Sequence, residues 1–115
     1  MHYGLDLASP KGTPVSAVTD GAVVFSGPCG GYGNVVILHH AGDVVTLYAH
    51  LAAPAPGLRP GVDVREGDII GRVGPAAGIK ESHLHFEVWE EGAARQPRSG
   101  LPAPRSPLTT AKGVN

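Results

Sequence analysis

Cysteine, aromatic side chains and long apolar runs are all scarce in this chain of 115 residues. Cys29 is the only cysteine, so an internal disulfide and a cysteine-rich metal site are both excluded. No stretch approaches the roughly 18 apolar residues that a membrane helix requires, and no charged-then-apolar leader opens the sequence. If the protein is exported, its signal is expected outside this chain, which reads as a domain of something longer.

Charge of one sign is also lacking, because nine Lys and Arg side chains are balanced by ten Asp and Glu side chains. Such a balance offers no attraction for a polyanion, so nucleic acid is not an expected partner. The length fits a single domain with a core of its own. We expect a monomeric domain over residues 1–100, followed by a Pro-rich and disordered tail over 101–115.

Glycine and proline are abundant, and between them lie short runs of Val, Ile and Leu. This pattern is typical of many brief strands joined by turns, and no segment predicts a helix. The sequence therefore predicts an all-β fold of small antiparallel sheets with glycine-cornered hairpins. One hairpin is expected to join residues 15–18 and 22–25 through Asp20–Gly21, and a longer one to join 34–40 and 44–50.

Two further segments complete the expected fold. Residues 52–60 hold three prolines and a glycine, so a loop is expected there. Residues 82–89 predict a final strand, in which alternate side chains point to opposite faces of the sheet. The expected core face is Leu84, Phe86 and Val88, and the opposite face is His83, His85 and Glu87.

Six histidines are many for this length, and four of them fall into three small clusters. In the first cluster, His2 and Asp6 would lie about 13 Å apart along a straight strand, too far to share a metal ion about 2 Å from each. Gly4 and the nearby Pro10 disfavour a helix, so we expect the chain to bend at Gly4. With that bend, the first cluster is a candidate pair of metal ligands.

The second cluster places His83 and His85 on one face of the final strand, with Cα atoms about 6.6 Å apart. This separation suits two roles at one centre, in which one ring binds an ion and the other stands beside a bound water. The third cluster ends in His50, where a strand passes into the proline-rich loop, and loop edges commonly present reactive side chains. Taken singly, each cluster is more often plain polar surface than a site.

The clusters gain weight from their joint order. The order is His-x-Gly-x-Asp from His2, Gly-Tyr-Gly-Asn ending at Asn34, Tyr-x-His-Leu around His50 and His-Leu-His-Phe-Glu-Val from His83. From residue 2 to about residue 97, the sequence resembles the lysostaphin/LytM-type family of peptidoglycan endopeptidases. The resemblance implies a barrel-sandwich-like fold, the duplicated hybrid motif, with a groove over one sheet.

The resemblance also implies a site, in which His2, Asp6 and His85 bind one zinc ion and His50 and His83 line the catalytic position. Two imidazoles and one carboxylate leave a fourth position of the ion open, as a catalytic zinc requires. On this interpretation, His83 acts as general base and His50 helps to stabilise the oxyanion. The implied function is hydrolysis of amide bonds in peptidoglycan stem peptides or cross-bridges, outside the cytoplasm.

Other residues stay open between a site role and an ordinary one. Glu87 could support a metal-binding histidine or could simply be exposed. Tyr32 and Asn34 could form the wall of a substrate groove or could serve only the shape of their turn. His39 and His40, at the end of the longer hairpin, are interpreted as solvated or supporting residues rather than ligands.

Two other classes of function remain as alternatives. The first is a non-cleaving cell-wall-binding or regulatory module, because relatives that lose ligands stop cutting; the five key residues are all present here. The second is a carrier or phosphotransfer domain, because biotinyl, lipoyl and sugar-phosphotransferase IIA domains share glycine-cornered sheets. A carrier needs a lysine at a hairpin tip, and Lys11, Lys80 and Lys112 all lie outside residues 62–70.

Overall fold

The computed structural model describes residues 2–75 and 81–90, and its regular structure is almost entirely β-strand. The strands are β1 (His2–Ala8), β2 (Pro14–Ser16), β3 (Gly21–Pro28), β4 (Asn34–His40), β5 (Val44–Pro54), β6 (Asp63–Val64), β7 (Ile69–Val73) and β8 (His83–Glu90). A single 3-10 turn, η1 (Gly30–Tyr32), joins β3 to β4. The all-β prediction is confirmed. The predicted tail over 101–115 lies outside the described residues.

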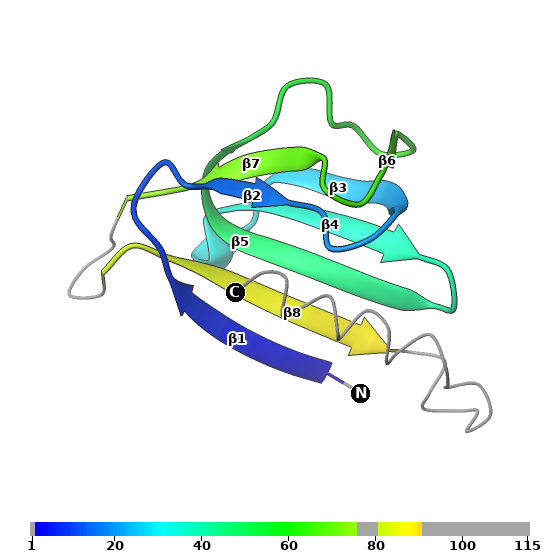
Figure 1. Cartoon of the computed structure of the whole chain (residues 1–115), viewed down its shortest axis with the longest axis horizontal. Coiled ribbons are helices and arrows are strands. Elements are labelled where there is room, and N and C mark those ends of the chain that lie inside the picture. Colours follow the sequence, from blue (N-terminus) through cyan, green and yellow to red (C-terminus); the bar gives the residue numbers. More distant parts are fainter. Residues whose placement is uncertain (1, 76–80, 91–115) are drawn as a thin grey trace.

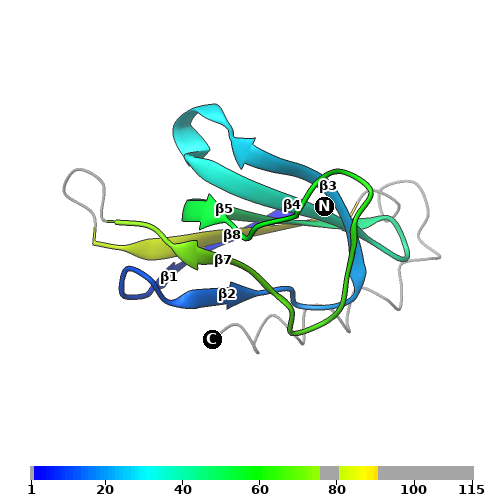
Figure 2. The same cartoon turned by 90° about the horizontal axis from the view of Figure 1, so that it is seen from above.

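Antiparallel pairing links all eight strands in the described part of the chain. The main path of the sheet runs β1-β8-β5-β4-β3-β6, while β2 pairs with β7 and β7 pairs in turn with β5. Figures 1 and 2 show β2 and β7 lying over one side of the long sheet as a second layer. Within residues 2–75 and 81–90, no helix is both long and apolar enough to cross a membrane.

The core fills the space between these two layers. Tyr48 and Phe86 are its largest fully buried side chains, and their ring centroids lie 5.3 Å apart. The strand β8 follows the predicted alternation, because Leu84, Phe86 and Val88 are buried in this core. The polar side chains of β8 therefore lie on the opposite face, which is the outer face of the sheet.

The predicted hairpin of residues 15–18 with 22–25 is wrong. Instead, β2 pairs with β7 and β3 pairs with β4 and β6, so the chain crosses from one layer to the other at Asp20. Backbone hydrogen bonds join Ala17 to the turn at Gly67–Asp68, and the Glu66 N–H donates to the Asp20 carboxylate at 2.8 Å. These bonds hold the crossing in place. Dipeptide chemistry at Asp20–Gly21 favours a turn but does not decide which strands pair.

The longer predicted hairpin is confirmed as β4 and β5. The predicted loop over 52–60 begins later than expected, because β5 continues to Pro54 and there pairs with Gly71 on β7. Proline is tolerated here because it is the last residue of the strand, where its missing N–H does not interrupt the pairing.

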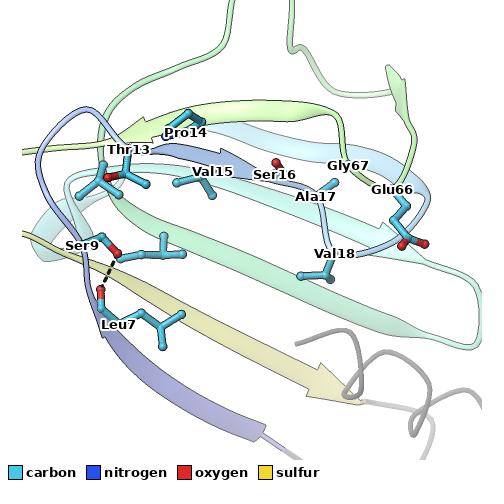
Figure 3. Close-up of a pocket in the computed structure, with 12 residues that line it drawn as sticks. Leu7, Ser9, Thr13, Pro14, Val15, Ser16, Ala17, Val18, Glu66 and Gly67 are labelled. Carbon is cyan, nitrogen blue, oxygen red and sulfur yellow. Dashed lines mark hydrogen bonds between the residues drawn. The ribbon is translucent and has the colours of Figure 1, made fainter. Parts of the chain in front are cut away.

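A cavity of about 290 Å³ opens between β1, β2 and β8 on the inner side of the sheet. Figure 3 shows Leu7 and Ser9 on one wall and Val15 to Val18 on the other, with the Ser9 hydroxyl donating to the Leu7 carbonyl at 3.1 Å. No histidine lines it. This cavity is a gap between the layers and not the candidate site.

A buried histidine closes the end of the β4–β5 hairpin. His40 is only 4% exposed, which excludes the solvated alternative predicted for it, whereas its neighbour His39 has a side chain that is 51% exposed. His40 Nδ1 donates to the Asp20 carbonyl at 2.7 Å, and Nε2 lies 2.7 Å from Thr46 Oγ1. The Thr46 hydroxyl is 3.0 Å from that of Tyr48, so the histidine ties the crossing at Asp20 to the core.

Gly21 is required where this histidine packs. A Cβ at position 21 would lie 2.6 Å from His40 Nδ1 and 2.7 Å from the His39 carbonyl oxygen. Neither the rigid His40 ring nor the His39 backbone can easily move away from such a Cβ. We therefore expect Gly21→Ala to lower the free energy of unfolding by about 1–3 kcal/mol. Urea unfolding of this variant beside Gly31→Ala, where a Cβ would meet nothing within 4 Å, measures the effect. Equal stability of the two variants would contradict it.

The stability of the protein should fall in mild acid because of His40. Burial lowers the pKa of His40 below its ordinary value of 6.5, so the unfolded chain takes up a proton that the folded chain refuses. The contribution to stability is complete above pH 6.5 and is lost as the pH falls toward the lowered value, by at most about 1.4 kcal/mol per pH unit.

Urea unfolding at pH 7.5 and pH 5.5 measures this loss. The variant His40→Gln should lose the extra decline between the two pH values, because its side chain cannot be protonated. The matched variant His39→Gln, at the exposed neighbour, should decline as the wild type does. If His40→Gln loses as much stability between pH 7.5 and pH 5.5 as the wild type does, groups other than His40 cause the acid sensitivity.

Candidate functional site

Pairing of β1 with β8 assembles one polar face from the two ends of the described chain. The register sets His2 opposite Trp89, Gly4 opposite Glu87 and Asp6 opposite His85. These side chains share the outer face of the sheet because alternate residues of a strand point to the same face, and along β8 the residues between them are buried in the core. The pairing runs without a register shift from His2 to Ala8, so the predicted bend at Gly4 is wrong.

Asp6, His83 and His85 form the centre of this face. Asp6 Oδ1 lies 2.6 Å from His85 Nδ1 and 3.9 Å from His83 Nε2. His83 Nδ1 donates to the Glu81 carbonyl at 2.9 Å, which leaves Nε2 of a neutral ring with its lone pair toward Asp6. Both imidazoles of the His-x-His motif thus lie within 4 Å of the same carboxylate oxygen, and their roles stay a prediction.

Glu87 is the buried anchor beneath that centre. Its side chain is only 5% exposed, and it accepts hydrogen bonds from His85 Nε2 at 2.7 Å, Trp89 Nε1 at 2.8 Å and the Tyr32 hydroxyl at 3.1 Å. The predicted role of Glu87 beside a histidine agrees with this geometry, and the alternative of an exposed Glu does not. A buried carboxylate with this many donors fixes the rings that surround it.

His2 lies on the same face but not in the central group. Its Nε2 is 3.2 Å from Glu87 Oε1, and its ring stacks on Trp89 with centroids 3.8 Å apart. The cause is the straight course of β1, which keeps His2 four residues away from Asp6. A Cβ at position 4 would make only ordinary contacts, 3.7 Å from His85 Cε1 and 3.9 Å from Glu87 Cγ, so packing here does not require glycine.

His50 reaches the centre from β5 through an unusual backbone conformation. Its φ is +62°, which a residue with a side chain adopts at a cost of about 1–3 kcal/mol. The strand bulges here, because Ala49 and His50 together face the single residue Val35 of β4. The bulge turns the His50 ring to 4.9 Å from that of His83 and 6.1 Å from that of His85, measured between centroids.

Two glycines lie beside the His50 backbone, and Gly74 is hydrogen-bonded to it. The Gly74 N–H donates to the His50 carbonyl at 2.9 Å, and a Cβ at Gly74 would lie 2.8 Å from that oxygen. Gly33 has a φ of +72°, and a Cβ added to it would lie 3.7 Å from His50 Cα, an ordinary contact distance. The glycine corners therefore serve the site directly, a role that composition alone did not reveal.

Tyr32 and Asn34, the predicted groove residues, behave differently. Tyr32 leans over the centre, with its ring 5.8 Å from that of His85 and its hydroxyl bonded to Glu87. Asn34 donates its side-chain amide to the Ala52 carbonyl at 2.9 Å, which braces the entry to β4. A contact with substrate stays a prediction for both residues.

Carboxylates surround His85 and shift several proton equilibria. Burial by itself lowers the pKa of His85, but hydrogen bonds to Asp6 and Glu87 outweigh it and raise that pKa above its ordinary value. Burial likewise acts to raise the pKa of Glu87, and the four donors around it lower that pKa instead. Hydrogen bonding to Glu87, and then its charge, raise the pKa of the Tyr32 phenol. The two carboxylates thus stabilise the protonated form of the His85 ring.

A zinc ion fits the donor types of this face. Asp6 and His85 offer a carboxylate oxygen and an imidazole nitrogen on adjacent strands, and Glu87 bonds the other nitrogen of His85, as carboxylates behind metal-bound histidines commonly do. As the side chains stand, however, no group of three or more His, Cys, Asp or Glu within residues 2–75 and 81–90 has the spacing of a metal site. The third predicted ligand, His2, contacts Glu87 instead.

Trp89 is a residue of the candidate site face that sequence reasoning did not single out. It lies 44% exposed beside the centre, donates to Glu87 and stacks on His2. The alternation along β8 offered a signal, because position 89 shares a face with 83, 85 and 87.

The family model described as Peptidase family M23 matches residues 1–97 of this chain. Among curated proteins, the DD-carboxypeptidase/endopeptidase Mpg of Neisseria meningitidis is 46% identical over 107 residues, which cover 90% of this chain and 24% of that protein. The murein hydrolase activator NlpD of Escherichia coli is 35% identical over 102 residues, covering 88% of this chain and 26% of that protein. The chain therefore spans about a quarter of the length of these relatives.

Comparison with solved structures also finds peptidases. The catalytic domain of the antimicrobial peptidase lysostaphin from Staphylococcus simulans matches with a TM-score of 0.68 at 28% identity, over 94% of this chain and 80% of that one. A structure described as a zinc containing peptidase from Vibrio cholerae matches with a TM-score of 0.66 at 33% identity, over 74% and 26% of the two chains. The resemblance to lysostaphin-like enzymes is confirmed, and the chain belongs to Peptidase family M23.

Proposed function

We propose that this domain is a zinc metallopeptidase that hydrolyses amide bonds in the peptides of peptidoglycan. The observation that carries the proposal is the convergence of Asp6, His83, His85 and His50 on one outer face, from three strands that are far apart in sequence. Membership of a peptidase family supports the class of reaction. The names of relatives that act on murein or on DD-peptide bonds support the substrate and an extracytoplasmic location.

His2, Asp6 and His85 are proposed to hold the zinc ion. When bound there, zinc would supply an acidified water and a positive charge for the carbonyl oxygen of the substrate. His2 would have to exchange its contact with Glu87 for one with the ion. The Glu87 carboxylate would retain its bond to His85 Nε2 and so keep Nδ1 turned toward Asp6.

His83 is proposed as the general base. Its bond from Nδ1 to the Glu81 carbonyl fixes the neutral tautomer, so Nε2 can accept a proton on the side that faces Asp6. The His50 ring beside it would donate a hydrogen bond to the oxyanion that forms on the substrate. The strained backbone of His50 fits a residue that is held for chemistry.

A second candidate function is a non-cleaving regulatory module, as the name of the relative NlpD suggests for that protein. One observation favours it: His2 contacts Glu87 and Trp89, and no group of three His, Cys, Asp or Glu in residues 2–75 and 81–90 has the spacing of a metal site. Zinc content separates the two candidates, because an enzyme should hold one ion per chain and a regulatory module none.

Digestion of purified peptidoglycan tests the enzyme proposal. The zinc-loaded protein should release peptide fragments, identified by mass spectrometry, and a chelator should stop the reaction. We expect His83→Ala to lower the rate about 100-fold to 10,000-fold while leaving zinc bound, because it removes the base and not a ligand. We expect His85→Ala to abolish both zinc binding and cleavage.

The exposed residue His39 supplies the matched control, and His39→Ala should cut at the wild-type rate. Intact walls and peptides after treatment with protein that holds stoichiometric zinc would refute the enzyme proposal.

Glu87 should tune the affinity for zinc. Replacing it as Glu87→Gln keeps its shape but removes the charge that holds His85 Nε2, so we expect zinc to bind about 10-fold to 100-fold more weakly. Competition with a chromophoric chelator measures the dissociation constant. The remote variant Glu66→Gln should bind zinc as the wild type does, and a matching affinity in Glu87→Gln would show that the carboxylate does not support a ligand.

A further inference from the structure

The outer edge of β1 is open in the part of the chain that the structure describes. Among those residues, β1 stands at one end of the sheet order and pairs only with β8, and Figure 1 shows it along the border of the sheet. Proteins commonly protect such an edge with lysine, proline or a bulge. The β1 sequence, HYGLDLA, contains neither residue, and its pairing with β8 has no register shift. The edge is therefore suited to pair with a further strand.

One hydrogen bond next to β1 shows which of its backbone groups face this edge. The Ser9 N–H donates to the Ser82 carbonyl at 3.2 Å, toward β8. Because the direction alternates along a strand, the backbone groups of odd-numbered β1 residues face β8 and those of even-numbered residues face the edge. A further antiparallel strand would therefore bond to the even-numbered residues, with Gly4 at their middle.

The apolar side chains of β1 form an exposed row on one face of this edge. Tyr3, Leu5 and Leu7 lie on the face where β8 carries core residues. Leu7 packs against the core, but Tyr3 and Leu5 are 46% and 45% exposed. Such a row favours a neighbouring strand that brings apolar side chains of its own. A second copy of β1 would bring the same row.

Two-fold symmetry allows few registers between two β1 strands. Even-numbered residues have to face even-numbered residues, so the axis can pass through Gly4, Leu5 or Asp6. An axis at Asp6 would set two carboxylates directly opposite each other, and an axis at Leu5 would set them on the diagonal between adjacent pairs. An axis at Gly4 separates the carboxylates and sets each Asp6 opposite the partner's His2. Charge therefore favours the axis at Gly4.

The apolar row favours the same axis. With the axis at Gly4, Tyr3 faces the partner's Leu5, and Leu5 faces the partner's Tyr3. These pairs are not hydrogen-bonded to each other, and in such pairs the side chains lie closest. The two half-exposed residues of β1 thus cover each other, while Leu7 already has its contact with the core.

We propose that two copies of this chain associate through their β1 edges, with the two-fold axis at Gly4. The two outer faces then become one, and each Asp6 has the partner's His2 on the neighbouring strand. Their Cα atoms would lie about 5.5 Å apart, against about 13 Å for His2 and Asp6 of one straight strand. Both side chains are accessible, since His2 is 42% and Asp6 is 51% exposed.

An imidazole N–H can donate to a carboxylate whether the ring is charged or neutral, so the contact between the two copies does not require acid. The sequence alone favours a monomer, whereas the edge of β1 favours this dimer. The inference goes beyond the proposed function and does not depend on it.

Sedimentation velocity of the full chain in chelator tests the association, because no metal ion can then bridge two copies. The interface is small, so we expect the mass to rise from one chain toward two between about 10 µM and 1 mM. Leu5→Lys should weaken the dimer about 10-fold or more, because it sets a charge against the partner's Tyr3. The matched Val24→Lys, at a 50% exposed apolar residue of β3, should not. Thermal unfolding checks that both variants keep the fold.

Disulfide formation tests the register. In a Cys29→Ala background, Tyr3→Cys and Leu5→Cys proteins are mixed and oxidised. The mixed disulfide should form about 10-fold faster than either homodimeric one, because positions 3 and 5 face each other across the interface.

Three results would overturn the inference. A mass of one chain at every concentration would show that a second copy does not pair with the edge. Equal weakening by Val24→Lys and Leu5→Lys would place the interface elsewhere. If Leu5→Cys alone forms its disulfide as fast as the mixture does, the axis does not lie at Gly4.

Discussion

The antiparallel pairing of β1 with β8 is the constraint on which the candidate site depends. It places Asp6 directly opposite His85, although 79 positions separate them along the chain. It also sets His2 opposite Trp89, and it puts the intervening Gly4 across from Glu87. A slip of one residue in this register would turn the β1 carboxylate to the core face and leave the histidines of β8 without it.

Glu87 makes the rest of this arrangement possible, because one buried carboxylate serves donors from three segments. It holds His85 for the centre, fastens Tyr32 above it and engages His2 and Trp89 beside it. Its contact with His2 competes with the zinc ligation proposed for that residue. Metal binding would then exchange a hydrogen bond to a carboxylate for a bond to an ion, within reach of the same imidazole.

Sequence reasoning predicted the parts of the fold that local pattern controls. Period-two alternation gave β8 and its two faces correctly, and the spacing of apolar runs gave the hairpin of β4 and β5. It failed at Asp20–Gly21, because a turn-forming dipeptide does not specify whether the chain doubles back or crosses to another layer. Burial of His40 was missed for a related reason, since its partners Asp20 and Thr46 are set by tertiary packing.

The candidate site was predictable in its residues more than in its geometry. Motif order pointed to the side chains that now lie on one face, and it included Glu87 as a supporting carboxylate. The straight course of β1 was not predictable, because the expectation of a bend assumed that His2 must reach the same ion as Asp6 in any state. The left-handed backbone of His50 also escaped prediction, because its carbonyl is bound by the N–H of Gly74, which approaches from another segment.

The position of β1 separates the integrity of the site from that of the fold. In the part of the chain that the structure describes, β1 stands at the end of the sheet order and pairs only with β8. Its apolar side chains Tyr3 and Leu5 are about half exposed, and Leu7 alone packs against the core. Detachment of this strand would therefore cost far less free energy than global unfolding. Separation of β1 from β8 would take Asp6 away from His85, and with it the proposed reaction, while the buried residues between the two layers keep their packing.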